Sequence, residues 1–256
     1  PETNPNPTLE IYTTGDATLF EEIAENWLHR KGLEVKTVTL EEKLTPIQLG
    51  KEIVIATNNV GKAKEFAKIF EPKGYKVKTL KDFPELDEVE ETGTTFEENA
   101  RLKAETIANA LQTIVLADDS GLCVDALEGL PGVYSARFAG EEKNDAANNA
   151  KLLSELGGLK GKERAAHFTC CLVLAAPFKE SLVVQAECHG EIATLPSGDS
   201  GFGYDPLFLV PEYQKTFAEL GMDIKNKISH RAKAIELLVE KWEQWTNSLG
   251  AVEETE

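Results

Sequence analysis

Short apolar strands alternate with amphipathic helices from residue 52 onward, and this alternation indicates an α/β fold. Strands are expected at 52–57, which has the apolar composition of a buried strand, and at 75–80, 114–117, 164–176 and 182–193. Helices are expected at 62–70, 96–112, 144–156 and 229–245. The helix at 96–112 is the best marked, because Thr95 and Glu98 form a capping box ahead of it.

Residues 1–48 differ from this pattern and are expected to form a separate N-terminal extension. Short strands are expected near residues 9–12 and 33–38, with a helical face at 19–28 between them. A β-α-β fragment of this size is marginal alone, so it suits the remnant of a larger domain, with a linker at 41–50. We therefore assign residues 1–48 to an extension with a Pro-rich lead, 49–248 to the main domain and 249–256 to a flexible acidic tail.

The charge balance limits the partners of the chain. A formal net charge of -17 repels nucleic acid and anionic membranes, and no apolar run has the length of a membrane span. A small anionic substrate then needs a local basic cluster or a metal ion. The four cysteines form no C-x-x-C motif and the N-terminus shows no signal peptide, so we expect reduced thiols and a cytoplasmic location.

An acidic pair follows the apolar strand expected at 114–117. Burying both Asp118 and Asp119 without a cation is costly, and strand ends are where α/β sheets place ligands. Neighbours in extended chain point to opposite faces, so only one of the two aims at a site unless the strand has turned. The alternative is an ordinary Asp-Ser-Gly turn.

A second acidic segment, 88–93, precedes the capped helix at 96–112. Its carboxylates either complement the helix dipole or bind Mg²⁺. On the helix, Asn99 and Lys103 are four residues apart and share a face.

Two segments suit an anion. The turn at 56–62 offers backbone N–H groups at a helix N-terminus, with Asn59 and Lys62 as further donors, although the Walker A spacing is missing. The basic run at 225–231 is expected to open the last helix, where cations oppose the dipole and an anion explains them. The alternatives are an ordinary polar turn and a solvated basic turn.

A glycine-rich segment, 200–206, carries two aromatic residues between alternating glycines. These aromatics either offer their faces to a flat ring or cover the core.

In order and spacing, these segments resemble the ITPase/Ham1/RdgB family of pyrophosphatases, which act on the non-standard purine nucleotides dITP, ITP and XTP. The resemblance covers about 52–242, and the N-terminal extension resembles that of some Gram-positive members. The matching segments are Thr57–Asn59 with Lys62, Glu91–Gly93, Phe96–Lys103, Ala117–Leu122, Pro131–Arg137, Gly201–Pro206 and Ser229–Arg231.

The resemblance implies an elongated, two-lobed α/β fold with a long mixed sheet, a nucleotide cleft between the lobes and a homodimer. It implies hydrolysis of dITP, ITP, XTP or dXTP to nucleoside monophosphate and pyrophosphate, which cleanses the nucleotide pool. By motif position, Glu91, Asp119 and Asp118 match the Mg²⁺ ligands, and Asp119 matches the general base acting on a metal-bound water.

The substrate contacts are likewise implied by motif position. The phosphate side matches Asn59, Lys62, Lys103 and Ser120, with Thr57, Asn58 and Gly61 from the same turn. The nucleoside side matches Phe202, Gly203, Tyr204, Asp205, Lys225, His230 and Arg231.

The chemistry of the residues agrees with this assignment. Lysines, an arginine and one Mg²⁺ neutralise a triphosphate in an acidic protein. A donor such as Arg231 or a loop N–H pairs with a 6-oxo group, whereas adenine leaves buried donors unpaired at about 1–3 kcal/mol each. This accounts for rejection of ATP but not of GTP, which shares the 6-oxo group.

Three rival functions remain at this stage. An aspartic protease needs two D-S-G sequences, and the chain has them at 119–121 and 199–201. A nucleotide-binding module without catalysis would be free to lose the carboxylates, yet all three are present. A pyrophosphatase for pyrimidine or damaged nucleotides fits the same motifs.

Overall fold

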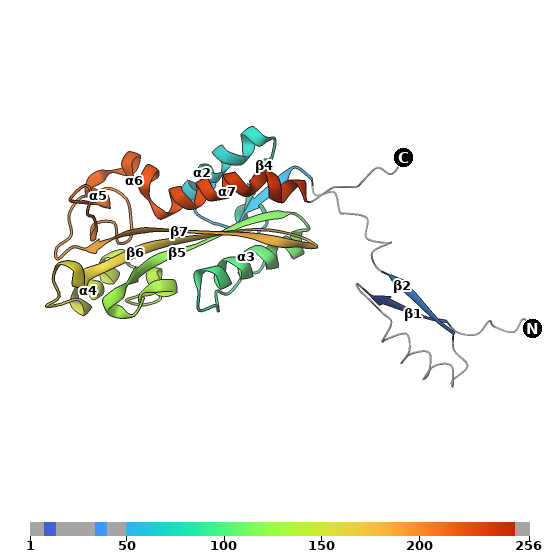
Figure 1. Cartoon of the computed structure of the whole chain (residues 1–256), viewed down its shortest axis with the longest axis horizontal. Coiled ribbons are helices and arrows are strands. Elements are labelled where there is room, and N and C mark those ends of the chain that lie inside the picture. Colours follow the sequence, from blue (N-terminus) through green and yellow to red (C-terminus); the bar gives the residue numbers. More distant parts are fainter. Residues whose placement is uncertain (1–7, 14–33, 40–49, 249–256) are drawn as a thin grey trace, which may run out of the picture. The chain divides into compact units, whose positions relative to one another are not determined.

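The computed structural model describes residues 8–13, 34–39 and 50–248, which belong to two compact units (Figure 1). In the first unit, β1 (Thr8–Thr13) pairs in parallel with β2 (Glu34–Thr39), which confirms the two short strands expected there. The expected helix at 19–28, the Pro-rich lead, the linker up to residue 49 and the tail from 249 lie outside the described residues.

The second unit is built on a mixed seven-stranded sheet, as predicted for an α/β fold. Its order is β4-β3-β5-β6-β7-β8-β9, with β4, β3 and β5 parallel and each later neighbour antiparallel. The strands are β3 (Glu52–Ile55), β4 (Lys76–Thr79), β5 (Ile114–Val124), β6 (Ala165–Ala176), β7 (Lys179–Ile192), β8 (Phe208–Val210) and β9 (Lys215–Thr216).

Helices connect and cover these strands. They are α2 (Val60–Phe70), α3 (Phe96–Leu111), α4 (Asp145–Glu155), α5 (Phe217–Leu220), α6 (Met222–Ile228) and α7 (His230–Asn247). Short 3-10 turns are η2 (Glu71–Lys73), η3 (Leu80–Asp82), η4 (Asp125–Leu127), η5 (Gly132–Arg137) and η6 (Gly161–Arg164). The four expected helices are confirmed, and the capping box of Thr95 and Glu98 begins α3.

Strand β5 does not end at the acidic pair, so the expectation of a strand end there was wrong. Asp118 pairs with Leu172 and Asp119 with Cys171, and the ladder continues to Val124. Gly121 does not mark a turn: a Cβ atom there would lie 2.4 Å from the Gly132 carbonyl oxygen. The glycine therefore allows η5 to approach the strand, and the Asp-Ser-Gly sequence stays extended.

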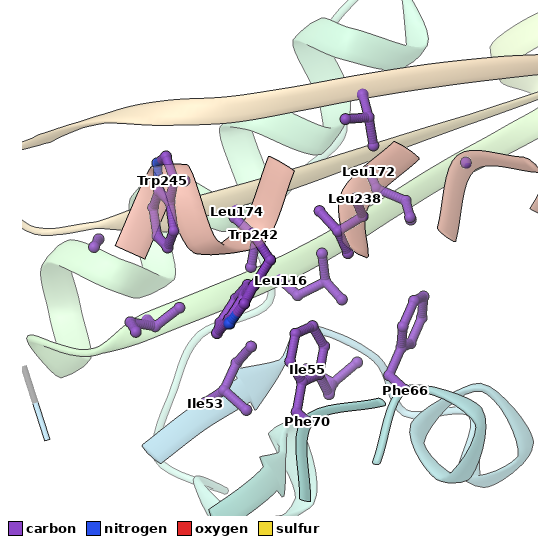
Figure 2. Packing of buried hydrophobic residues seen from close by; sticks show 14 of the residues in the cluster. Ile53, Ile55, Phe66, Phe70, Leu116, Leu172, Leu174, Leu238, Trp242 and Trp245 are labelled. Carbon is purple, nitrogen blue, oxygen red and sulfur yellow. The ribbon is translucent and has the colours of Figure 1, made fainter. Parts of the chain in front are cut away.

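Side chains alternate between two faces of β5 and β6. Even-numbered positions such as Leu116 and Leu172 pack against Phe66 of α2 and Leu238 and Trp242 of α7 (Figure 2). Odd-numbered positions pack beneath α3; they include Val115, Ala117, Cys171 and Val173.

A further apolar cluster lies along the same strands. It joins Leu122 and Phe168 to Leu152 of α4 and to Phe208 and Phe217. The long strands β5, β6 and β7 thus serve two packed regions (Figure 1). The acidic pair lies in the stretch of β5 between them, from Asp118 to Gly121. None of the described helices is long and apolar enough to cross a membrane.

Candidate active site

The pleat of β5 sends its two adjacent carboxylates to opposite faces of the sheet. Asp118 contacts Lys62 of α2 and Arg231 of α7, while Asp119 lies on the α3 face. The expectation that an extended strand separates the pair is therefore confirmed.

The Asp118 side chain is fully engaged by donors. Its Oδ1 accepts a hydrogen bond from Ser120 Oγ at 2.7 Å, and its Oδ2 lies 3.1 Å from Arg231 Nε and 3.5 Å from Lys62 Nζ. Burial alone would raise the pKa of this carboxyl, which is 6% exposed, but Lys62 and Arg231 hold its pKa well below the usual range. Asp118 is therefore ionised at any pH near neutrality.

Asp119 has the opposite surroundings. Its Oδ2 is buried without a hydrogen-bond partner. Burial, together with the negative charges of Glu91 and Asp118, raises its pKa to about 7, although Lys103 and Asn99 act in the other direction. An oxygen that lacks a partner in a region of negative potential is suited to a cation or a proton.

Glu91 and Lys103 complete this second face. Lys103 Nζ lies 2.6 Å from Glu91 Oε1 and donates to the Asp118 carbonyl oxygen at 2.8 Å. Gly93 N–H donates to Asn99 Oδ1 at 2.7 Å, which anchors the acidic segment to α3. The predicted common face of Asn99 and Lys103 thus points at β5.

The turn before α2 is shaped by its own side chains. Asn59 is the N-cap, and its Oδ1 accepts from the N–H groups of Gly61 and Lys62 at 2.9 and 3.1 Å. Thr57 Oγ1 accepts from Asn59 N–H at 3.0 Å. The Asn59 oxygen is therefore occupied by the helix cap, and the amide nitrogen, the donor that was predicted to face phosphate, is the group left to contact a ligand.

The glycine-rich segment separates its two aromatic residues. Phe202 is 57% exposed, whereas Tyr204 is buried and donates its hydroxyl to the Ser135 carbonyl oxygen at 2.6 Å. Asp205 is also buried; it pairs with Lys225 Nζ at 2.5 Å and accepts from the Phe202 N–H at 3.1 Å. Of the two aromatic residues, only Phe202 therefore has an exposed ring that a ligand can contact. Lys225 Nζ lies 4.6 Å from the centre of the Phe202 ring.

The basic run at 225–231 is divided between two helices, which corrects the expectation that it opens the last one. Lys225 and Lys227 lie in the last turn of α6, where the helix dipole favours cations. Only His230 and Arg231 lie in the first turn of α7, after the N-cap Ser229. Of these two, Arg231 carries the charge to which the dipole argument for an anion applies, because His230 is neutral.

His230 is buried against the core and is neutral. Its ring stacks on Phe168, with centroids 4.8 Å apart, and its Nδ1 has no hydrogen-bond partner. Burial and the charges of Arg231 and Lys225 lower its pKa to about 3. The imidazole therefore offers uncharged hydrogen-bonding chemistry at neutral pH.

A cavity of about 1040 Å³ opens beside the Asp119 face. Four of the predicted residues line it: Thr57, Asn58, Glu91 and Lys103. Three cations for which no role was predicted also line it, Lys81, Arg137 and Lys143. Arg137 lies within the matched segment 131–137, and that match was its only signal.

The predicted residues thus form two groups around β5. Lys62, Arg231 and Ser120 gather at Asp118, while Glu91 and Lys103 gather with Asp119. Lys225 and Asp205 form a buried pair that holds the segment carrying Phe202 and Gly203. Asp199 of the second D-S-G is exposed outside the described strands, so the paired geometry of an aspartic protease is not met.

Comparison with known proteins finds similarity over nearly the same part of the chain as the motifs, residues 52–242. The model of the Ham1 family matches residues 53–241. A dITP/XTP pyrophosphatase of Geobacillus kaustophilus is 56% identical over 203 residues, which are 79% of this chain and 100% of that protein. One from Streptococcus pyogenes serotype M18 is 58% identical over 197 residues, covering 77% of this chain and 60% of its own. The chain therefore spans less than two thirds of that streptococcal relative.

Solved structures resemble the sheet-containing unit. The Staphylococcus aureus Ham1 protein has a TM-score of 0.72 at 49% identity and covers 75% of this chain and 98% of its own. A Mycobacterium abscessus protein, titled nucleoside-triphosphatase / dITP/XTP pyrophosphatase, has a TM-score of 0.66 at 40% identity, with 73% and 97% covered.

Proposed function

This chain belongs to the Ham1 family, and we propose that it hydrolyses dITP, ITP, XTP and dXTP to the nucleoside monophosphate and pyrophosphate. Relatives that carry the name dITP/XTP pyrophosphatase support this substrate class. The observation that carries the proposal is the difference between the two faces of β5. On one face Asp118 is paired with cations; on the other, Asp119 has an oxygen without a hydrogen-bond partner and is flanked by Glu91 and Lys103, which line a cavity of about 1040 Å³.

The residues of the Asp119 face fit a magnesium ion. A buried carboxylate oxygen without a partner and the adjacent Glu91 are the hard oxygen donors that Mg²⁺ prefers. Glu91 and Asp119 would hold the ion, whereas both Asp118 oxygens are already taken by Ser120, Arg231 and Lys62. When bound, Mg²⁺ supplies positive charge that stabilises the phosphate oxygens in the transition state.

The side chains divide the remaining work. Asp119 accepts a proton from the attacking water while the α–β phosphoanhydride bond breaks and pyrophosphate leaves. Lys103, which pairs with Glu91, would be free to bind a phosphate oxygen once Glu91 holds the ion, and Lys62 would reach the same substrate from the other side of β5. Asp118 orients Lys62 and Arg231 without itself exchanging a proton, because its pKa is so low.

The base is read by the segment around Phe202 and by α7. Phe202 offers a ring face for stacking, and its support comes from the Asp205–Lys225 pair. Arg231 provides its remaining guanidinium N–H groups as donors for a 6-oxo group, with the neutral His230 beside it, whereas the N–H groups of Phe202 and Gly203 already donate to Asp205 and Asp145. Facing adenine, these donors would remain unpaired.

We further propose the domain roles and the setting of the enzyme. Residues 49–248 form the catalytic domain, residues 1–48 an N-terminal extension and 249–256 an acidic tail. The enzyme acts as a homodimer in the cytoplasm, where its substrates are made and where its four unpaired cysteines stay reduced.

A panel of nucleoside triphosphates with Mg²⁺ tests the proposal, scored separately for pyrophosphate and orthophosphate. We expect pyrophosphate from ITP, dITP and XTP, little turnover of ATP, and loss of activity with EDTA. Release of orthophosphate, or equal turnover of ATP and ITP, would refute the assignment. A preference for pyrimidine nucleotides would favour the related rival.

A further inference from the structure

Two histidines and a carboxylate meet on the same face of the sheet as Asp119, but farther along the strands. His167 lies on β6, and Glu187 and His189 lie on β7; their ligand atoms are all within 4.8 Å of one another. His189 Nε2 lies 2.9 Å and His167 Nε2 3.8 Å from the two oxygens of Glu187. Each oxygen of the carboxylate thus has one imidazole nitrogen near it.

The backbone itself brings these side chains together. His167 is directly opposite His189 in the β6–β7 register, and Glu187 is two residues before His189, so all three share one face. The imidazole rings are 5.1 Å apart with an interplanar angle of 33°. Because the register of a long hairpin fixes this spacing, little ordering is needed before a ligand binds.

We propose that His167, Glu187 and His189 form a binding site for a transition metal ion of the Zn²⁺ class. Two imidazoles and one carboxylate suit Zn²⁺, Cu²⁺ or Ni²⁺, whereas Mg²⁺ prefers oxygen ligands alone. Bonds of about 2.0–2.1 Å require the three donor atoms to approach to about 3–4 Å of each other. The His189 side chain is 72% exposed and is free to make this small rotation.

The site is separate from the proposed catalytic centre. Asp119 pairs with Cys171, whereas His167 pairs with Cys123, four residues farther along β5. Four residues of strand span about 13 Å. An ion at the histidines would therefore join β6 to β7 without touching Asp119 or Glu91, so we expect it to stabilise the sheet.

Zinc binding by the full chain, purified without a polyhistidine tag, tests this proposal. Excess Mg²⁺ is kept present so that the acidic site does not take up Zn²⁺. We expect one Zn²⁺ per chain by calorimetry and a rise in Tm of about 3–6 °C at saturating Zn²⁺. In a His167→Gln/His189→Gln variant we expect the affinity to fall at least about tenfold and the Tm rise to vanish.

Matched variants separate ligand loss from misfolding. Glu187→Gln should weaken Zn²⁺ binding, whereas Glu180→Gln, the same change at an exposed position of the same strand, should not. Far-UV circular dichroism and the Tm without Zn²⁺ should match the wild type in every variant. The proposal is overturned if the wild type binds no Zn²⁺ under these conditions, or if the double histidine variant binds it as tightly as the wild type.

Discussion

Asp118 and Asp119 are neighbours in the chain, yet they occupy two different electrostatic regions. On the α2 and α7 face, Lys62, Arg231 and Ser120 surround Asp118 and hold its pKa well below its usual range. On the α3 face, burial and nearby carboxylates raise the pKa of Asp119 to about 7. One peptide bond separates a permanently ionised group from one that exchanges a proton near neutrality.

The difference shows how a strand can assign two roles to one acidic pair. The pleat alone sends the side chains apart, and the helices above and below then supply opposite surroundings. The Asp118 face offers fixed cations, while the Asp119 face offers a buried carboxylate oxygen without a hydrogen-bond partner, with Glu91 and Lys103 leading to a cavity. This is the separation of pKa values that marks acid-base assignments in active sites.

The largest effect is expected from Asp119→Asn, which removes the carboxylate on the α3 face. Turnover of ITP should fall by about 10²–10⁴-fold, because the amide cannot accept the proton of water. Steady-state pyrophosphate release measures it, with far-UV circular dichroism as the control for folding. Near-normal turnover would contradict the assignment of Asp119 as the general base.

Asp118→Asn should instead act mainly on stability. It leaves Arg231 and Lys62 without their buried partner, so the free energy of unfolding should drop by about 2–4 kcal/mol. The depressed pKa means that this contribution is complete above about pH 4, declines progressively as the pH falls below the ordinary value of 3.8, and is lost only below the pKa of the folded protein. Urea unfolding at pH 7 and at about pH 2.5 measures the difference, with a smaller loss expected at the lower pH; an equal loss at both would contradict the ion-pair account.

Arg231→Ala tests whether the cationic face also reads the base. We expect KM for ITP to rise and the preference for ITP over ATP to narrow by about tenfold, since one donor to the 6-oxo group is lost at about 1–3 kcal/mol. Steady-state kinetics with ITP and with ATP measure this. Lys62→Ala is the control, because it removes a cation that pairs with Asp118 but no donor to the base, so the ITP/ATP preference should not change. An unchanged ITP/ATP ratio would move base recognition elsewhere.

The smallest expected effect is a gain of stability in metal-free Asp119→Asn. The unfolded carboxyl has a pKa of 3.8 and the folded one about 7, so the folded state binds more protons between these values. Asp119 therefore lowers stability increasingly as pH rises through this window. The variant should be more stable by about 1–2 kcal/mol at pH 8 and not at pH 4. Thermal melts in EDTA measure it, and added Mg²⁺ should stabilise only the wild type.

Much of the fold was predictable from local patterns. The capping box placed α3 correctly, and the periodicity placed α7, because these signals lie within a few residues. The course of β5 through Asp118–Gly121 was not predictable, since two carboxylates and a glycine disfavour a strand interior. Only the tertiary neighbours, Arg231 for one carboxylate and η5 against Gly121, make that conformation stable.

The sequence predicted which residues belong to the site better than how those residues are arranged in space. Motif order gathered Glu91, Asp118 and Asp119, but it could not say which carboxylate pairs with Arg231. The division of the basic run between α6 and α7 was equally hidden, because Ser229 reads as a helix start without showing that another helix ends just before it. The histidine pair on β6 and β7 depends on strand register, which no short motif encodes.

The long strands also have a mechanical consequence. Strands β5, β6 and β7 run without a break through both packed regions, with Asp118 and Asp119 in the stretch between. Any movement of one packed region against the other must bend this continuous hydrogen-bonded sheet, because no loop between the two regions is available as a hinge in these three strands. We therefore expect the two regions to move only slightly against each other and the two carboxylates to keep their positions.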